Sequence, residues 1–158
     1  MAKICAFFGH RDIPDNLELS LREQIEHVIT HYGITEFWDG CYGDFDHLAA
    51  QIVTSLKSQY PHIRLVQVHA YPPSGSTLRR GFDRAFLPDI LTNIRDNTCI
   101  PRRNIWMAYH CDIIISYVNH AESKIHEPLD RMHGRIPIFN LGIYQPLSRF
   151  QRQLPFQG

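Results

Sequence analysis

Residues 3–12 read KICAFFGHRD, and residues 37–53 read FWDGCYGDFDHLAAQIV. In both stretches a short apolar run, long enough only for a buried strand, passes into a turn that carries glycine and charge. The second turn leads directly into the apolar spacing of a helix. Because strands that are apolar on both faces are typical of parallel sheets covered on both sides, these stretches favour an α/β fold.

The same alternation continues through most of the chain. Gly33 is suited to end a helix that begins near Asp15 or Asn16, and Pro61 ends a second helix. Residues 69–100 show no clear period and are expected to form an irregular insert or lid. The further strands are expected at 34–38, 63–68, 112–118 and 136–141, and the further helices at 102–111 and 122–135.

This pattern predicts one domain over residues 1–142, followed by a tail at 143–158. We expect a doubly wound, mostly parallel sheet of about five strands with helices on both faces. In such sheets ligands bind outside the carboxyl ends of the strands, which is where both glycine-bearing turns fall.

The composition excludes several classes of protein. The 158 residues are 44% hydrophobic and 20% charged, as in soluble globular proteins, and 16 basic residues balance 16 acidic ones. The balance argues against a nucleic-acid or membrane partner. Four cysteines without a CxxC pair indicate neither a zinc ribbon nor a disulfide framework, so we expect a cytoplasmic protein with no metal and no resident cofactor.

The first turn, Gly9 to Asp12, is a candidate anion site. Arg11 can donate two hydrogen bonds to a phosphate, and His10 adds a donor or a titratable base. The alternative is a surface loop whose Arg11–Asp12 pair contributes little. We favour a binding role, because loops at strand ends are where such folds place their sites.

The second turn, Gly40 to Asp44, enters a helix whose first N–H groups can bind an anion. Its glycines allow a ligand to approach the backbone closely. The alternative, that Asp44 simply caps the helix, is equally favoured. Since Asp44 competes with an anion for these N–H groups, a ribose hydroxyl is the better partner for its carboxylate. Tyr42 could stack on a base or serve in packing.

Two later segments add candidate ligand residues. Arg102, Arg103 and Asn104 are expected to begin a helix, where arginines oppose the helix dipole unless an anion or an acidic neighbour is present. Asn119 follows the fourth strand as a candidate cap, in a loop without the glycine that a phosphate cradle needs. The candidate catalytic carboxylates are Asp44, Asp46 and Glu122, but no motif identifies a reaction.

Five segments, CAFFGHRD, YGDFDHLAAQIV, LKSQYPHIRLVQVHAY, PRRNIWMAYHCDIIISYV and IPIFNL, together resemble a YpsA-type protein of the SMF/DprA–LOG (SLOG) superfamily. The resemblance implies a Rossmann-like fold and a nucleotide-related ligand over the carboxyl ends of the strands. Members of this superfamily often dimerise through helices beside the sheet, so the resemblance also implies a homodimer. The pocket residues it implies are Gly9, His10, Arg11, Gly40, Gly43, Asp44, Asp46, Arg103 and Asn104.

Three functions remain open at this point. The favoured one is binding or sensing of a nucleotide-derived small molecule. The second is an N-glycosidic hydrolase, although the chain lacks the P-G-G-x-G-T-x-x-E motif of the phosphoribohydrolases in the superfamily. The third is an interaction or single-stranded-DNA-binding protein whose pocket has decayed, since residues 119–127 read NHAESKIHE where relatives usually carry a Gly-Gly pair.

Overall fold

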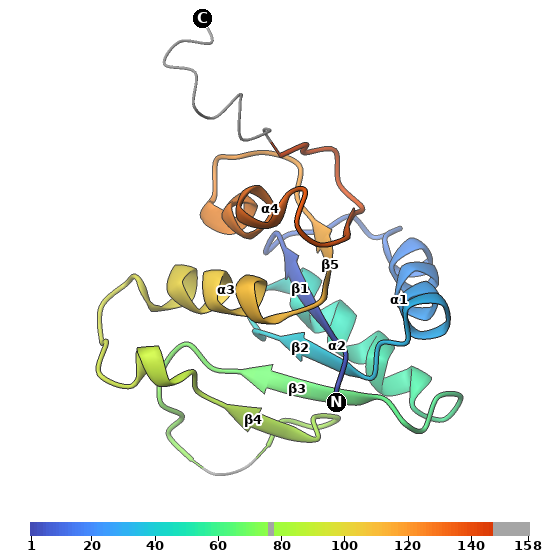
Figure 1. The fold of residues 1–158 in the computed structure, drawn as a ribbon, viewed down its shortest axis with the longest axis horizontal. Helices are drawn as coiled ribbons and strands as arrows, with labels where there is room; N and C mark the ends of the chain where they lie inside the picture. Colours follow the sequence, from blue (N-terminus) through green and yellow to red (C-terminus); the bar gives the residue numbers. More distant parts are fainter. Residues whose placement is uncertain (76–77, 147–158) are drawn as a thin grey trace, which may run out of the picture.

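The computed structural model describes residues 1–75 and 78–146. It shows an α/β domain built on one six-stranded, all-parallel sheet with the strand order β4-β3-β2-β1-β5-β6. This confirms the predicted fold class (Figure 1). The strands are β1 (Ile4–Gly9), β2 (Glu36–Asp39), β3 (Arg64–Val68), β4 (Arg84–Phe86), β5 (Ile113–Tyr117) and β6 (Ile138–Asn140).

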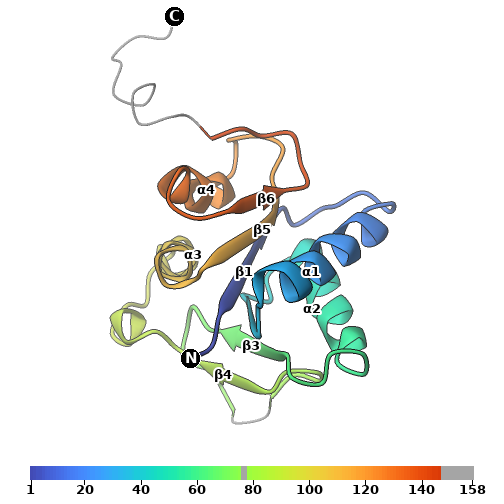
Figure 2. The ribbon, with the colours of Figure 1, turned by 45° about the vertical axis from the view of Figure 1, so that its right-hand side comes forward.

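Helices cover both faces of the sheet, as Figure 2 shows: α1 and α2 lie on one side and α3 and α4 on the other. The two short 3-10 helices precede α3 and α4. None of the helices in the described part of the chain is long and apolar enough to cross a membrane. The helices are α1 (Glu18–Tyr32), α2 (Asp44–Leu56), η1 (Asp89–Leu91), α3 (Cys99–His110), η2 (Lys124–His126) and α4 (Glu127–Met132).

The core consists of two apolar layers, one on each face of β1. Phe7 faces α1 and α2 and stacks on Phe37 with ring centroids 5.6 Å apart, whereas Phe8 faces α3 and α4. Burying each such ring stabilises the fold by roughly 1.5–3 kcal/mol. Alternate residues of the central strands are therefore buried on opposite faces, which is why these strands read as continuous apolar runs.

Several local expectations change in detail. Gly33 ends α1 in the left-handed conformation with φ 68°, as predicted, but α1 begins at Glu18 and no side chain caps it. The segment 69–100 contains a sixth strand, β4, and the short helix η1. Helix α3 begins at Cys99 rather than at Arg102, and of the expected tail only residues 143–146 lie within the described residues.

Candidate functional site

The turn after β1 is held against the first turn of α2. A Cβ atom on Gly9 would lie 2.2 Å from Cγ of Phe45, so no larger residue fits there. The next residue, His10, donates its backbone N–H to the carbonyl of Tyr117 on β5 at 3.1 Å. These contacts fix the start of the turn between β5 and α2 and place the side chains of residues 10–12 at the carboxyl edge of the sheet.

The turn after β2 lies directly beside it. The N–H of Asp44 donates to the carbonyl of Arg11 at 2.8 Å, and a Cβ on Gly43, whose φ is +101°, would lie 2.7 Å from Cα of Arg11. The N–H groups of Cys41 and Tyr42 donate to the carboxylates of Asp39 and Asp46. Three N–H groups of this turn thus have protein acceptors, so an anion must be held mainly by side chains.

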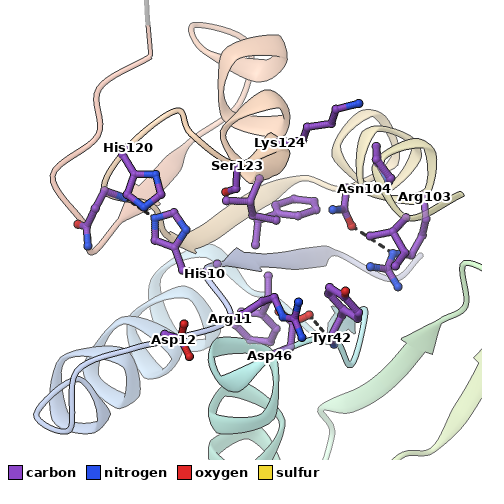
Figure 3. Close-up of a pocket in the computed structure, with 17 residues that line it drawn as sticks. His10, Arg11, Asp12, Tyr42, Asp46, Arg103, Asn104, His120, Ser123 and Lys124 are labelled. Carbon is purple, nitrogen blue, oxygen red and sulfur yellow. Dashed lines mark hydrogen bonds between the residues drawn. The ribbon is translucent and has the colours of Figure 1, made fainter. Parts of the chain in front are cut away.

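A cavity of about 420 Å³ opens over these two turns (Figure 3). It lies over the carboxyl ends of β1 and β5, between the start of α2, helix α3 and the loop that follows β5. Its size falls in the range of small-molecule sites. Its lining residues are Phe7, Phe8, Gly9, His10, Arg11, Asp12, Tyr42, Asp46, Ile100, Pro101, Arg103, Asn104, Asn119, His120, Ser123, Lys124 and Ile125.

Arg103 is nearly enclosed, with 4% of its surface exposed. Its Nη1 donates to the carbonyls of Gly40 and Val68 at 3.0 and 3.3 Å, and its Nε donates to Oδ1 of Asn104 at 3.1 Å. Gly40 is required here, because a Cβ would lie 2.7 Å from Cζ of Arg103. Since α3 starts at Cys99, Arg103 lies one turn inside the helix and faces the sheet, whereas Arg102 is exposed.

Two carboxyl groups accompany this guanidinium without forming an ion pair with it within 4.0 Å among the described residues. Asp46, 6% exposed, accepts the N–H of Tyr42 at 3.0 Å through Oδ2. Burial raises the pKa of Asp46 to about 7, although the Tyr42 N–H and Arg103 oppose the shift. Burial and the neighbouring Asp46 also raise the pKa of Asp39, whose Oδ2 is buried without a hydrogen bond.

The loop after β5 closes the cavity with side chains. Nε2 of His10 accepts the N–H of Asn119 at 2.8 Å, and the His10 ring stacks on His120 with centroids 4.3 Å apart. Burial and His120 lower the pKa of His10, which favours the neutral ring that can accept this hydrogen bond. Ser123 and Lys124 complete this wall, so the loop lines the cavity although it contains no glycine.

Two cations border the cavity without a carboxylate partner among the described residues. Arg11 and Lys124 are exposed and form no ion pair within 4.0 Å. The guanidinium of Arg11 lies over the ring of Tyr42, 5.0 Å from its centroid, which orients it beside the cavity. Such cations are suited to bind a phosphate group.

The structure brings most of the expected ligand residues to this cavity. Gly40 borders an adjoining hollow and Gly43 packs behind Arg11. Asp44 is exposed and lines a separate shallow hollow beside Asp15, and Glu122 is exposed outside the cavity. Of the three candidate catalytic carboxylates, only Asp46 therefore lines it. The expected residues that line the cavity are Gly9, His10, Arg11, Tyr42, Asp46, Arg103, Asn104 and Asn119.

Sequence reasoning did not assign several residues of this region to the site. Asp39 ends β2 directly before a glycine, and a carboxylate at such a strand end is the sequence feature that could have assigned it to the site. His120, Ser123 and Lys124 lie in the loop after β5, where the absence of glycine had argued against a phosphate-binding role. Within the described residues, no three His, Cys, Asp or Glu side chains gather as a metal site.

Comparisons with known proteins identify the fold. The chain matches no family model, and no curated protein is detectably similar in sequence. Solved structures do match: DNA processing protein A from Streptococcus pneumoniae superposes with a TM-score of 0.63 at 15% identity, covering 96% of this chain and 54% of that one. This chain thus spans about half the length of that protein.

Two further matches are proteins named for binding or carrying the molybdenum cofactor. The molybdenum cofactor binding protein from Rippkaea orientalis superposes with a TM-score of 0.59 at 14% identity, over 91% of this chain and 78% of that one. The Moco carrier protein from Chlamydomonas reinhardtii superposes with a TM-score of 0.53 at 16% identity, over 90% of this chain and 78% of that one. At these identities the likeness shows a shared fold, the one that the SLOG resemblance implies.

Proposed function

We propose that this chain binds a phosphate-bearing, nucleotide-derived small molecule in the cavity over β1 and β5, as a YpsA-type binder or sensor. The observation that carries the proposal is the grouping around one cavity of Arg11 and Lys124, two cations without a carboxylate partner among the described residues, with a buried acidic group, Asp46. A phosphate needs the cations and a sugar hydroxyl needs an acceptor. A sugar phosphate needs both.

The geometry assigns a role to each group. Arg11 can donate two parallel hydrogen bonds to phosphate oxygens, and Lys124 contributes a second positive charge from the opposite wall (Figure 3). Oδ2 of Asp46 is occupied by the Tyr42 N–H, whereas Oδ1 has no hydrogen bond among the described residues. That oxygen is available to accept a hydrogen bond from a ligand hydroxyl.

The fold supports this location. In open parallel sheets, ligands bind outside the carboxyl ends of the strands where the chain order reverses, and here the reversal falls between β1 and β5. The matched proteins are named for DNA processing and for binding the molybdenum cofactor, and a nucleotide-derived ligand is chemically related to DNA.

Isothermal titration calorimetry with nucleoside monophosphates, nucleoside diphosphates, ADP-ribose and NAD tests the proposal. We expect at least one of them to bind, and Arg11→Ala to weaken its binding by roughly 10- to 100-fold, the worth of a charge-assisted hydrogen bond. Arg135→Ala is the matched control, because Arg135 is exposed before the amino end of β6.

Two outcomes would contradict the proposal. One is the absence of binding by every compound in this panel. The other is tighter binding of a short single-stranded oligonucleotide, with an affinity that falls steeply as salt is added, which would indicate a nucleic-acid site instead. Homodimer formation stays a separate prediction, to be measured by sedimentation.

A further inference from the structure

A second hollow of about 290 Å³ adjoins the main cavity at the carboxyl end of β3. Tyr42, Ile100 and Arg103 line both spaces, so the two meet over the buried guanidinium. Beyond this junction the hollow is bordered by Gln67, at the end of β3, and by His69 and Tyr71, in the segment that follows. A ligand lying across Arg103 can therefore reach both spaces.

Gln67 is the unusual residue of this hollow. Only 8% of it is exposed, yet its carboxamide forms no hydrogen bond with any described residue. The carboxamide of Asn140 on β6 shows the contrast, because its Nδ2 donates to the carbonyls of Val118 and Tyr144 and its Oδ1 accepts the N–H of Val118. Because Gln67 lines the hollow and neither polar atom of its carboxamide is closed off from solvent, the carboxamide is free to bind a ligand there.

Flat, uncharged groups line the same hollow. Tyr71 is 40% exposed, and its hydroxyl donates to the carbonyl of Asp96 at 3.2 Å, which fixes the ring. Tyr42 is 44% exposed at the boundary with the main cavity. Burial, Arg103 and Arg79 lower the pKa of His69, so its ring is neutral at pH 7. Exposed aromatic faces beside a neutral ring favour stacking of a planar heterocycle.

We propose that this second hollow is a nucleobase subsite in which the carboxamide of Gln67 binds the hydrogen-bonding edge of the base. The inference rests on the proposed function, because the sugar and phosphate of the same ligand occupy the main cavity. A carboxamide presents a donor and an acceptor side by side, which matches the paired donor and acceptor on a base edge. Arg103, which lies under both spaces, faces the sugar and phosphate between them.

The experiment compares ribose 5-phosphate with the adenosine, guanosine, cytidine and uridine 5′-monophosphates by calorimetry. Ribose 5-phosphate reports on the main cavity alone. We expect at least one nucleotide to bind about tenfold or more tightly than ribose 5-phosphate, since its base can form a bidentate contact that ribose 5-phosphate lacks. Gln67→Leu should remove this advantage and leave the affinity for ribose 5-phosphate unchanged.

Two further variants make the result specific. Gln59→Leu changes the same side chain at an exposed position near the end of α2 and should alter neither affinity. Tyr71→Leu, on the rim, should reduce the nucleotide advantage several-fold without touching the interior, which keeps the test valid should Gln67→Leu fail to fold.

Ribose 5-phosphate and all four nucleotides binding equally to the wild type would overturn the base subsite and leave the proposed function standing. Equal weakening of both kinds of ligand by Gln67→Leu, in a variant that folds as the wild type does, would also overturn it. If ribose 5-phosphate, the four monophosphates and the nucleoside diphosphates, ADP-ribose and NAD of the first panel all fail to bind, the proposed function itself fails, and the base subsite fails with it.

Discussion

Strands β2, β3 and β4 begin beside polar side chains, and β2 and β3 also carry them at their carboxyl ends. The two ends differ in how these side chains are paired. At the amino ends, Oε2 of Glu36 accepts from Nε1 of Trp38 at 2.7 Å and from Nη2 of Arg84 at 2.8 Å. Asp83 accepts from Nζ of Lys57 at 2.7 Å and from the N–H of Leu65 at 2.8 Å. Each carboxylate here has two donors.

The carboxyl ends are different. Oδ2 of Asp39 and the carboxamide of Gln67 form no hydrogen bond with any described residue, and Nη2 of Arg103 forms none either. Among these groups, Oδ2 of Asp39 is closed off from solvent without a partner, which is unfavourable for folding, whereas the other two remain open to a ligand. The amino-end groups therefore stabilise the fold, and the unpaired groups at the carboxyl ends agree with the ligand site proposed above.

The sharpest test of this difference is Asp46→Asn. The carboxyl of Asp46 has a pKa of about 7 in the folded chain, raised by burial against the Tyr42 N–H and Arg103. From about pH 4 to pH 7 Asp46 is ionised in the unfolded chain and protonated in the folded one, so wild-type stability falls as the pH rises. We expect Asp46→Asn to be more stable by about 2–4 kcal/mol at pH 8, with the difference vanishing toward pH 4.

Urea unfolding at pH 4 to 8 measures this difference. Asp44→Asn is the matched control, two residues earlier on α2 and exposed. Since a carboxylate in the first turn of a helix is stabilising, the control should lose about 0.3–1 kcal/mol at neutral pH. If the free energies of unfolding of the wild type and Asp46→Asn changed with pH in parallel, Asp46 would destabilise the fold no more than a paired carboxylate does, and the prediction would be wrong.

The amino end gives the opposite expectation. Glu36→Ala leaves the indole N–H of Trp38 without an acceptor and removes the partner of Arg84, so we expect a loss of about 2 kcal/mol of stability. The ligand affinity should not change, because Glu36 lies at the other end of β2. Glu23→Ala, at an exposed position of α1, controls for the loss of a carboxylate. A fall in affinity as large as that in Arg11→Ala would contradict the separation of the two ends.

Much of the architecture could be predicted from the sequence, because it depends on local signals. The apolar runs that became β1 and β5 are buried on both faces of the sheet, and Gly33 ends α1 in the conformation that favours glycine. The two turns at the carboxyl edge could be located for the same reason, since Gly9 and Gly43 stand where a side chain would collide with Phe45 or Arg11.

The remaining features depend on contacts that no local pattern encodes. Strand β4 is a three-residue edge strand, defined only by pairing with β3. Arg103 and Gln67 look like surface residues in the sequence, and their burial follows from where α3 and β3 pack. Because α3 starts at Cys99, Arg103 lies one turn inside the helix rather than at its start, and its guanidinium is buried there.

The smallest effect we predict is for Asp83→Asn, and its pH dependence should mirror that of Asp46→Asn. Burial raises the pKa of Asp83, but the hydrogen bonds from Lys57 and Leu65 and the charges of Lys57 and Arg64 outweigh it, so the pKa is lowered overall. The ionised carboxylate therefore stabilises the fold above its unfolded pKa of about 3.9, and this contribution is lost as the pH falls through the lower, folded value.

Because this ion pair is partly exposed, we expect Asp83→Asn to lose only about 0.5–1 kcal/mol at pH 7, and less with added salt. The asparagine can still accept the N–H of Leu65, so the strand pairing should survive. Unfolding measured on both variants in one pH series would give differences from the wild type of opposite sign at neutral pH. If both differences had the same sign, the paired and the unpaired carboxyl groups would affect stability in the same way. The unpaired groups at the carboxyl edge would then no longer support a ligand site.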